Sequence, residues 1–412
     1  MLDFTNLDKI LRIFVTMKKF RLILSIICAA AVAVSCADID PDPVPEPTPD
    51  PKPAPDPVVV KYAVKDVSAM TLEEKVGQMF FCRPEDLSGA STSSAVDDAI
   101  KAGFKKIPVG GFTLFGYSNN KNIDTPEQTF AFVKALHAFD NYPLLTVDEE
   151  GGTVLRIGNR SSFGLQKIGD MCNVTSDDEA KKDGKYIGNY LFNLGFDVDF
   201  APVADILTNA NNTVVKKRSF GGSPSVVAGR VSNFYAGLRS AKVEGCLKHF
   251  PGHGDTDGDS HEGIVIAKKT WEQMSKCEMV PFQKAIEDGV SMIMVGHIST
   301  PNVTGNYEPS SLSKEIVTDK LRGELGFKGV IITDGMGMGA VNHEVEEATI
   351  LAVKAGVDIV LLPANLTKAY NALLDAVKAG DIPEARINES VERIVALKKA
   401  ILTERGQLEE KK

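Results

Sequence analysis

The stretch Val330-Ile331-Ile332-Thr333-Asp334-Gly335 is a short apolar, β-branched run that ends at once in an acid and a glycine. It does not alternate apolar with polar residues, as a strand with one solvated face would. A run of this kind is typical of a strand that is buried on both faces of a parallel sheet. Asp334 is therefore expected at the carboxyl end of a buried strand.

Seven more apolar runs occur along the chain, at Gln78–Cys82, Gly111–Phe115, Pro143–Val147, Asp197–Ala201, Gly245–Lys248, Met292–Val295 and Asp358–Leu362. Helix-like segments lie between them, at Thr125–Phe139, Asp178–Leu194, Pro224–Ala241, Thr270–Glu287, Ser313–Leu325 and Glu344–Ala355. Strands that alternate with helices predict an α/β fold, and eight such units predict one TIM-type (β/α)8 barrel. A doubly wound open sheet is the alternative, because periodicity does not show whether a sheet closes.

The composition is that of one large globular domain. The 412 residues are 43% hydrophobic and 25% charged, with a formal net charge of −9 and a pI near 5.4. An acidic chain argues against a nucleic-acid partner, and we expect a monomer. Four widely spaced cysteines, Cys82, Cys172, Cys246 and Cys277, show no CxxC pattern, so they predict no metal site and leave a disulfide open.

Residues 1–36 have the pattern of a signal peptide, with a basic start after Met17, an apolar run over Leu22–Val34 and then Ser35-Cys36. Cys36 resembles the lipid-attachment site of bacterial lipoproteins, which predicts a lipid anchor in the cell envelope, either periplasmic or surface-exposed. Residues 37–60 form an acidic, Pro-rich linker, expected to be an extended spacer before a catalytic domain at 61–412. An uncleaved membrane anchor is the alternative, and whether residues 1–16 are translated stays open.

Three of the six histidines and three aspartates fall within one stretch, Lys248-His249-Phe250-Pro251-Gly252-His253-Gly254-Asp255-Thr256-Asp257-Gly258-Asp259-Ser260-His261. Its proline and glycines predict an irregular loop. The aspartates fit the start of a calcium loop, but Ser260 and Ile266 stand where that loop needs Gly and Glu. Pro251 prevents the helix that would bring His249 and His253 to one zinc ion. Acid–base catalysis is the favoured interpretation.

This stretch resembles the KH(F/I)PGHGxxxxDSH motif of bacterial β-N-acetylglucosaminidases in glycoside hydrolase family 3, of the peptidoglycan-recycling type. Three more segments resemble that family in the same chain order: Asp148-Glu149-Glu150-Gly151-Gly152 with Arg156, Arg218-Ser219-Phe220-Gly221, and Thr333-Asp334-Gly335-Met336. The resemblance covers roughly residues 65–405. It implies a barrel glycosidase without a cofactor or metal, acting on a GlcNAc-containing glycan or peptidoglycan fragment.

The resemblance also implies roles for individual residues. Asp334 is the expected nucleophile, which gives a covalent glycosyl-enzyme and retention of configuration. His261 is the expected acid/base, with Asp259 orienting its imidazole. The implied sugar-binding residues are Asp148, Arg156, Arg218, Lys248 and His249. Several of these residues follow predicted strands, which is where barrel enzymes carry their active sites.

The chain departs from the family pattern at Glu149, where the family has Gln, at Thr153, and at Gly335-Met336-Gly337. These changes leave subsite preference open, whereas the retained D-x-H loop favours a 2-acetamido sugar. Three alternatives remain: a substrate-assisted hexosaminidase that uses the adjacent Asp148 and Glu149, a non-catalytic glycan-binding lipoprotein, and a metal-dependent barrel hydrolase. The natural glycan, and whether water or phosphate accepts the sugar, also stay open.

Overall fold

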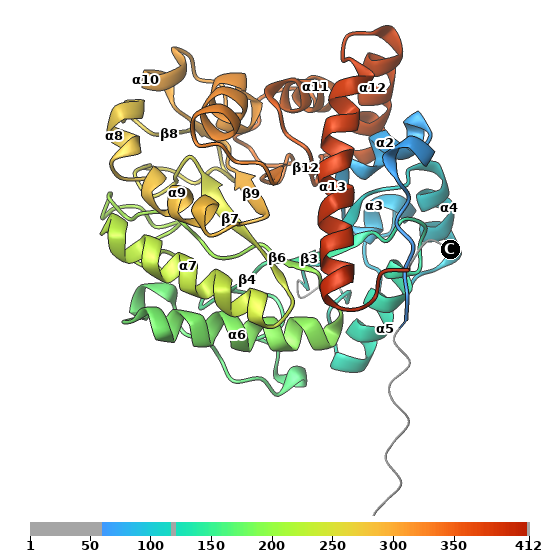
Figure 1. Ribbon diagram of the computed structural model, residues 1–412, viewed down its shortest axis with the longest axis horizontal. Coiled ribbons are helices and arrows are strands. Elements are labelled where there is room, and N and C mark those ends of the chain that lie inside the picture. The colour runs from blue at the N-terminus through green and yellow to red at the C-terminus, as the bar shows by residue number, and fades with distance from the viewer. Residues whose placement is uncertain (1–59, 117–120, 410–412) are drawn as a thin grey trace, which may run out of the picture. The chain divides into compact units, whose positions relative to one another are not determined.

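A computed structural model describes residues 60–116 and 121–409 (Figure 1). The expected signal peptide, Cys36 and nearly all of the linker lie outside these residues. Eight strands form one parallel sheet: β1 (Phe80–Cys82), β2 (Gly111–Thr113), β3 (Leu144–Val147), β6 (Val198–Asp199), β7 (Glu244–Phe250), β9 (Met292–Val295), β11 (Val330–Thr333) and β12 (Val360–Leu361). From β1 to β11 they neighbour one another in chain order, and β12 pairs with β1.

Helices surround this sheet. The longer ones are α2 (Leu72–Gln78), α4 (Asp98–Lys106), α5 (Pro126–His137), α6 (Asp177–Leu194), α7 (Pro224–Ser240), α9 (Met279–Glu287), η6 (Glu315–Glu324), α11 (Val345–Ala355), α12 (Leu366–Ala379) and α13 (Glu384–Glu404). The short ones are η2 (Val67–Ala69), α3 (Pro84–Ser88), η3 (Ser161–Phe163), η4 (Met171–Asn173), α8 (Trp271–Ser275), α10 (Pro301–Thr304) and η5 (Ser310–Leu312). Two small sheets, β4 (Glu149–Gly151) with β5 (Val154–Leu155) and β8 (Val265–Ile266) with β10 (Ile298–Ser299), lie outside the main one.

Local sequence explains where these elements begin and end. The four residues of β3 are all buried, as are those of β9 and β11, which matches their lack of alternation. Helix α6 starts where the Ser176 side chain accepts a hydrogen bond from the amide of Glu179, with three acids in its first turn. It ends at Gly195, which adopts the left-handed conformation at φ 90°.

The sheet closes into a barrel at β11 and β12. Ile332 and Ile359 form a parallel bridge, the amides of Asp358 and Ile359 both donate to the carbonyl of Ile331, and the carboxylate of Asp358 accepts the Ile331 amide at 2.9 Å. The same buried carboxylate also receives the guanidinium groups of Arg322 and Arg393. One anion therefore holds the last strand, η6 and α13 together.

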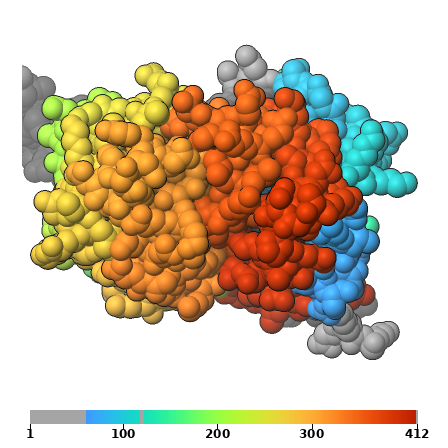
Figure 2. All heavy atoms as spheres, turned by 90° about the horizontal axis from the view of Figure 1, so that it is seen from above, coloured from blue at the N-terminus to red at the C-terminus, as the bar shows by residue number. Residues whose placement is uncertain are grey.

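The two ends of the described chain also meet. Tyr62 forms a parallel bridge with Leu408, and α2 contacts α12 and α13. Figure 2 shows the first described residues, in blue, beside the red C-terminal helices. Among residues 60–116 and 121–409, no helix has both the length and the apolar character needed to span a bilayer.

The structure confirms the eight predicted strands to within about two residues at each end. The open-sheet alternative is wrong, because β12 pairs with β1 and bridges to β11. The single helix predicted over Thr270–Glu287 is also wrong. It is divided into α8 and α9 by a turn, in which Lys276 and Cys277 donate their amides to Gln273 and Met274. The four cysteines within the described residues are free thiols.

Replacing Asp358 with Ala is expected to lower the free energy of unfolding by about 3–5 kcal/mol, because the part-buried Arg322 and Arg393 lose their shared, fully buried counter-ion. Urea denaturation of the purified protein measures this change. The control is Asp381, an exposed residue in the turn between α12 and α13. Asp381→Ala should change the free energy of unfolding by less than about 0.5 kcal/mol. Equal stabilities for the two variants would contradict the proposed role of Asp358 in closure.

Candidate active site

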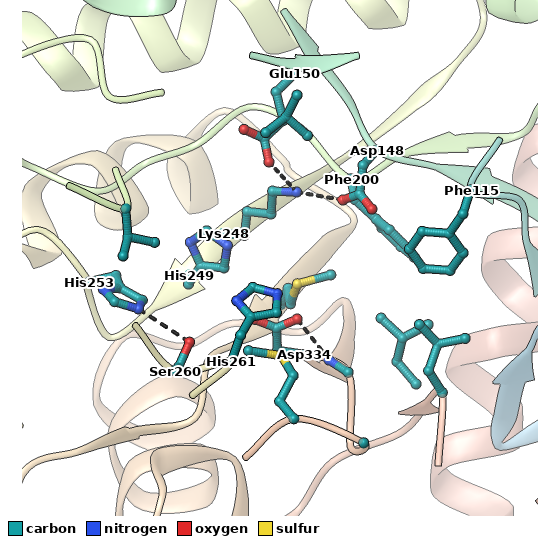
Figure 3. A pocket seen from close by; sticks show the side chains of 18 of the residues that line it. Phe115, Asp148, Glu150, Phe200, Lys248, His249, His253, Ser260, His261 and Asp334 are labelled. Atoms are coloured by element: carbon teal, nitrogen blue, oxygen red, sulfur yellow. Dashed lines mark hydrogen bonds and ion pairs between the residues drawn. The ribbon is translucent and has the colours of Figure 1, made fainter. Parts of the chain in front are cut away.

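A pocket of about 400 Å³ lies at the carboxyl ends of the barrel strands. Its walls come from residues in or after all eight strands of the barrel (Figure 3). Seven of the eight predicted site residues line it: Asp148, Arg156, Arg218, Lys248, His249, His261 and Asp334. The eighth, Asp259, does not line the pocket but contacts His261.

A buried charged cluster forms one wall of this pocket. The ammonium of Lys248, which is 2% exposed, lies 2.7 Å from Asp148 Oδ1 and 2.6 Å from Glu150 Oε1. Arg218 holds Glu150 in a two-point ion pair, with both N–O distances at 2.7 Å. The two cations and the two carboxylates therefore hold one another in place.

The pKa shifts in this cluster have opposite signs. Burial raises the pKa of Glu150, but the charges of Arg218 and Lys248 outweigh it and hold that pKa far below its usual range. Burial lowers the pKa of Lys248, but Asp148 and Glu150 outweigh it and raise that pKa. The cluster thus offers permanent donors and acceptors to a polar ligand at any ordinary pH.

Arg156 is positioned through Glu149, which is fully buried and does not line the pocket. The Glu149 carboxylate accepts the amides of Arg156, Ile157 and Gly158 at 2.6, 3.0 and 2.6 Å, and the Tyr190 hydroxyl at 2.7 Å. Three of these four donors are consecutive backbone amides, so residues 156–158, which follow β5, curve around the Glu149 carboxylate. The substrate-assisted alternative fails on this point, because Glu149 is not available to a ligand beside Asp148.

His249 is held from behind by Asp205, a buried residue that the sequence analysis did not single out. Asp205 Oδ2 lies 2.7 Å from His249 Nδ1, and its Oδ1 accepts the amide of His253 at 2.7 Å. Burial raises the pKa of Asp205, but the neighbouring His249 outweighs it and the pKa falls below its usual value. Asp205 follows β6 by six residues, and only its acid type near a strand end could have signalled it.

Asp334 follows β11 and is part-buried in the pocket wall. Its amide donates to the carbonyl of Val295, and its Oδ1 accepts the amide of Gly335 at 2.7 Å. Burial raises the pKa of this carboxyl, but the imidazoles of His249 and His297, the Gly335 amide and Lys248 outweigh it, so the pKa lies below its usual value. Asp334 is therefore an ionised carboxylate with one oxygen fixed by the backbone.

His297, the other histidine near a strand end, contacts the segment that follows Asp334. Its Nε2 lies 3.0 Å from the carbonyl of Gly335 and its Nδ1 lies 2.7 Å from Ser311 Oγ. Burial lowers the pKa of His297. It does not line the pocket, so its contacts bear on the shape of the segment after Asp334.

His261 projects into the pocket from the loop after β7 (Figure 3). Its Nδ1 lies 2.8 Å from Asp259 Oδ1, which also accepts the His261 amide at 2.9 Å. Burial raises the pKa of Asp259, but these two hydrogen bonds outweigh it and lower the pKa. The His261 side chain is 68% exposed, whereas its neighbour Ser260 is buried and lies 3.3 Å from His253 Nε2.

An apolar wall completes the pocket, and the sequence analysis did not assign it. Its members are Phe115, Phe200, Met294, Leu361 and Leu362. Figure 3 shows Phe115 and Phe200 next to Asp148, and the guanidinium of Arg156 lies 5.6 Å from the centre of the Phe115 ring. Apolar surface beside fixed charges suits a ligand with hydroxyls on its edge and carbon on its faces.

The three aspartates of the loop do not converge on a common point. Asp255 pairs with Lys269, Asp257 with Asn209 and Lys268, and Asp259 with His261. Within the part of the chain that the structure describes, no three His, Cys, Asp or Glu side chains are grouped to hold a metal ion.

Comparison with known proteins agrees with the barrel fold. Residues 71–397 match the glycosyl hydrolase family 3 N terminal domain. Beta-hexosaminidase A of Pseudoalteromonas piscicida is 32% identical over 321 residues, which are 70% of this chain and 53% of that protein. Beta-hexosaminidase LpqI of Mycobacterium tuberculosis is 34% identical over 265 residues, 62% of this chain and 67% of that protein.

Solved structures give the same result. A glycoside hydrolase family 3 beta-N-acetylglucosaminidase from Paenibacillus sp. superposes with a TM-score of 0.76 at 32% identity, covering 84% of this chain and 65% of that one. A beta-N-acetylhexosaminidase from Beutenbergia cavernae has a TM-score of 0.70 at 27% identity, covering 80% and 99%. The chain spans only about half of the Pseudoalteromonas protein. By its matched domain, its relatives and its barrel, the chain belongs to glycoside hydrolase family 3.

Proposed function

We propose that this protein is a retaining exo-β-N-acetylglucosaminidase, with Asp334 as nucleophile and His261 as acid/base. The observation that carries the proposal is that an ionised Asp334 and the imidazole of His261 line one pocket, together with a fixed set of sugar-binding charges. Glycoside hydrolysis needs a group that captures the anomeric carbon and a group that moves a proton. These two side chains supply one each.

In the first step, a carboxylate oxygen of Asp334 attacks C1 of the sugar as the bond from C1 to the leaving oxygen breaks. The imidazolium of His261 gives its proton to that oxygen, so the aglycone leaves as a neutral alcohol. Asp259 accepts the N–H at Nδ1, which leaves Nε2 as the atom that transfers the proton. The product is a covalent glycosyl ester on Asp334.

In the second step, the neutral imidazole takes a proton from water as the water oxygen attacks C1. The ester bond to Asp334 breaks and the carboxylate is restored, with the sugar released in its original configuration. His261 ends the cycle protonated, ready for the next substrate. Two displacements at C1 account for retention.

The buried cluster is the proposed site of the non-reducing terminal sugar. Asp148, Lys248 and Arg218 are fixed by mutual ion pairs, so they bind hydroxyl groups without first losing side-chain freedom. Relatives described as beta-hexosaminidases and a beta-N-acetylglucosaminidase support a 2-acetamido sugar as the bound unit. A binding role alone would leave the Asp259–His261 pair and the ionised Asp334 without a task.

We further propose that Cys36 carries a lipid and tethers the catalytic domain to the cell envelope through the Pro-rich segment at 37–60. A charged, proline-rich segment would act as an extended spacer. The proposed substrate is a GlcNAc-containing glycan or peptidoglycan fragment, which the enzyme would meet there as a monomer.

Replacing Asp334 with Asn should reduce turnover of an aryl GlcNAc β-glycoside by several orders of magnitude, with the circular dichroism spectrum unchanged. A 5-fluoro-GlcNAc donor should label Asp334 in the native enzyme, as peptide mass spectrometry can verify. Because the pKa of Asp334 lies below its usual value, the acid limb of kcat/KM, which reports the glycosylation step, should lie below that of an ordinary aspartate while the fold persists. A label on another residue, or inversion at C1 seen by NMR, would refute this assignment.

Replacing His261 with Ala should reduce kcat/KM by about 100-fold or more for an alkyl-linked disaccharide, but far less for a dinitrophenyl glycoside that needs no proton donor. Deglycosylation still needs a base, so the dinitrophenyl substrate should show a burst. The Asp259→Asn variant should show the same pattern more weakly. Equal losses on both substrates would assign the proton to another residue.

Replacing Cys36 with Ser should move the protein from the membrane fraction to the soluble fraction of the producing bacterium. Globomycin, which blocks lipoprotein signal peptidase, should cause the unprocessed form of the native protein to accumulate. A Cys36→Ser protein that stays in the membrane fraction would favour an uncleaved anchor.

A further inference from the structure

Two loops carry the two proposed catalytic groups, and they are joined through their backbones. The nucleophile loop is residues 334–344, and the acid/base loop is residues 251–262. The amide of Gly339 donates to the carbonyl of His261 at 3.2 Å, and the amide of Ala340 donates to the carbonyl of Ser260 at 3.1 Å. The nucleophile loop thus binds the acid/base loop at the residue that carries the imidazole.

Gly339 lies so close to this loop that no side chain fits between them. A Cβ atom on Gly339 would lie 2.9 Å from the carbonyl oxygen of His261, and 3.0 and 3.1 Å from the carbonyl carbon and oxygen of Glu262. All three atoms belong to the backbone, so the clash cannot be relieved by a side-chain rotation. Gly339 is not in the left-handed backbone conformation, so closeness alone accounts for the glycine.

The imidazole of His261 depends on this backbone contact for its position. Among the described residues, its side-chain hydrogen bonds are confined to Asp259, which belongs to the same loop. Its side chain is 68% exposed, so packing does little to fix it. Asp334, in contrast, is tied to β9 through the Val295 carbonyl. The distance between the two groups is therefore set by where the acid/base loop rests on the nucleophile loop.

We propose that Gly339 is a positioning residue, which sets the acid/base imidazole relative to the nucleophile by letting the two loops touch. This inference rests on the proposed roles of Asp334 and His261. A methyl group at position 339 pushes His261 and Glu262 away from the nucleophile loop while Asp334 and the sugar-binding cluster stay in place. Proton transfer is sensitive to such a shift, because a displacement of about 1 Å costs on the order of 100-fold in rate.

The chemistry distinguishes this role from general damage. A dinitrophenyl leaving group departs without a proton, so its glycosylation step depends on Asp334 alone. Azide attacks C1 of the glycosyl-enzyme and displaces the Asp334 carboxylate, which gives a glycosyl azide without any proton transfer. Azide therefore bypasses the base that water needs. A displaced His261 slows the steps that move a proton and leaves the others intact.

The test compares Gly339→Ala with Gly263→Ala in the full-length protein. Gly263 lies just beyond the acid/base loop, is not in the left-handed conformation, and has no atom within 4 Å of where its Cβ would be. Gly339→Ala should lose about 10- to 100-fold in kcat/KM on a GlcNAc-terminated disaccharide. It should keep a full burst on the dinitrophenyl glycoside, and azide should accelerate its steady state and yield glycosyl azide. Gly263→Ala should match the native enzyme throughout.

Several results would overturn the proposal. One is a Gly339→Ala variant that equals Gly263→Ala on the disaccharide. Another is a Gly339→Ala variant that loses both substrates equally, or that shows no burst and no azide effect, because such losses mean damage to Asp334 or to the fold. Failure of the proposed function is seen separately, since the native enzyme would then show no covalent Asp334 adduct and no turnover of any GlcNAc glycoside.

Discussion

The rest of this site depends on the ion pairs that the ammonium group of Lys248 makes with two carboxylates. It extends from the end of β7 and lies between the carboxylates of Asp148 and Glu150, which follow β3. A buried lysine without counter-ions would lose its proton or destabilise the barrel. The carboxylates would repel each other without the lysine. The ends of β3 and β7 must therefore lie close enough for these ion pairs to form when the barrel folds. The same ion pairs form the polar end of the pocket.

Much of this could be predicted from sequence, for identifiable reasons. Strands such as Val330–Thr333 were predictable because burial on both faces removes alternation, and polar residues directly after them had to meet at one end of the barrel. The match of motifs in chain order led to the family, which the domain match confirms. In the structure, seven of the eight residues that the sequence named as candidates line one pocket, and their individual roles stay proposals.

What sequence could not provide depends on contacts between distant segments. The role of Glu149 in holding Arg156 rests on four donors, one of them the Tyr190 hydroxyl from α6, and no local pattern announces such a convergence. Asp205 is recognisable as a support for His249 only once β6 and β7 lie side by side. The break between α8 and α9, in contrast, has a local signal in the sequence, because Pro281 lacks the amide hydrogen that a continuous helix needs and lies in the first turn of α9.

The side chains at the two ends of the pocket differ in how strongly their positions are fixed. This difference matches two tasks of a glycosidase, which has to hold one sugar and also let substrate enter and product leave. The inner groups are buried or part-buried and joined by ion pairs, so the proposed terminal sugar would be bound by side chains in fixed positions. At the outer end, the His261 side chain is exposed, and among the described residues its hydrogen bonds are confined to Asp259 of the same loop. An exposed side chain is less constrained than the ion-paired groups, which suits the end of a site where substrate enters and product leaves. A histidine also suits a site whose proposed nucleophile is the ionised Asp334, because an imidazole carries no negative charge in either protonation state and is therefore not repelled by that carboxylate.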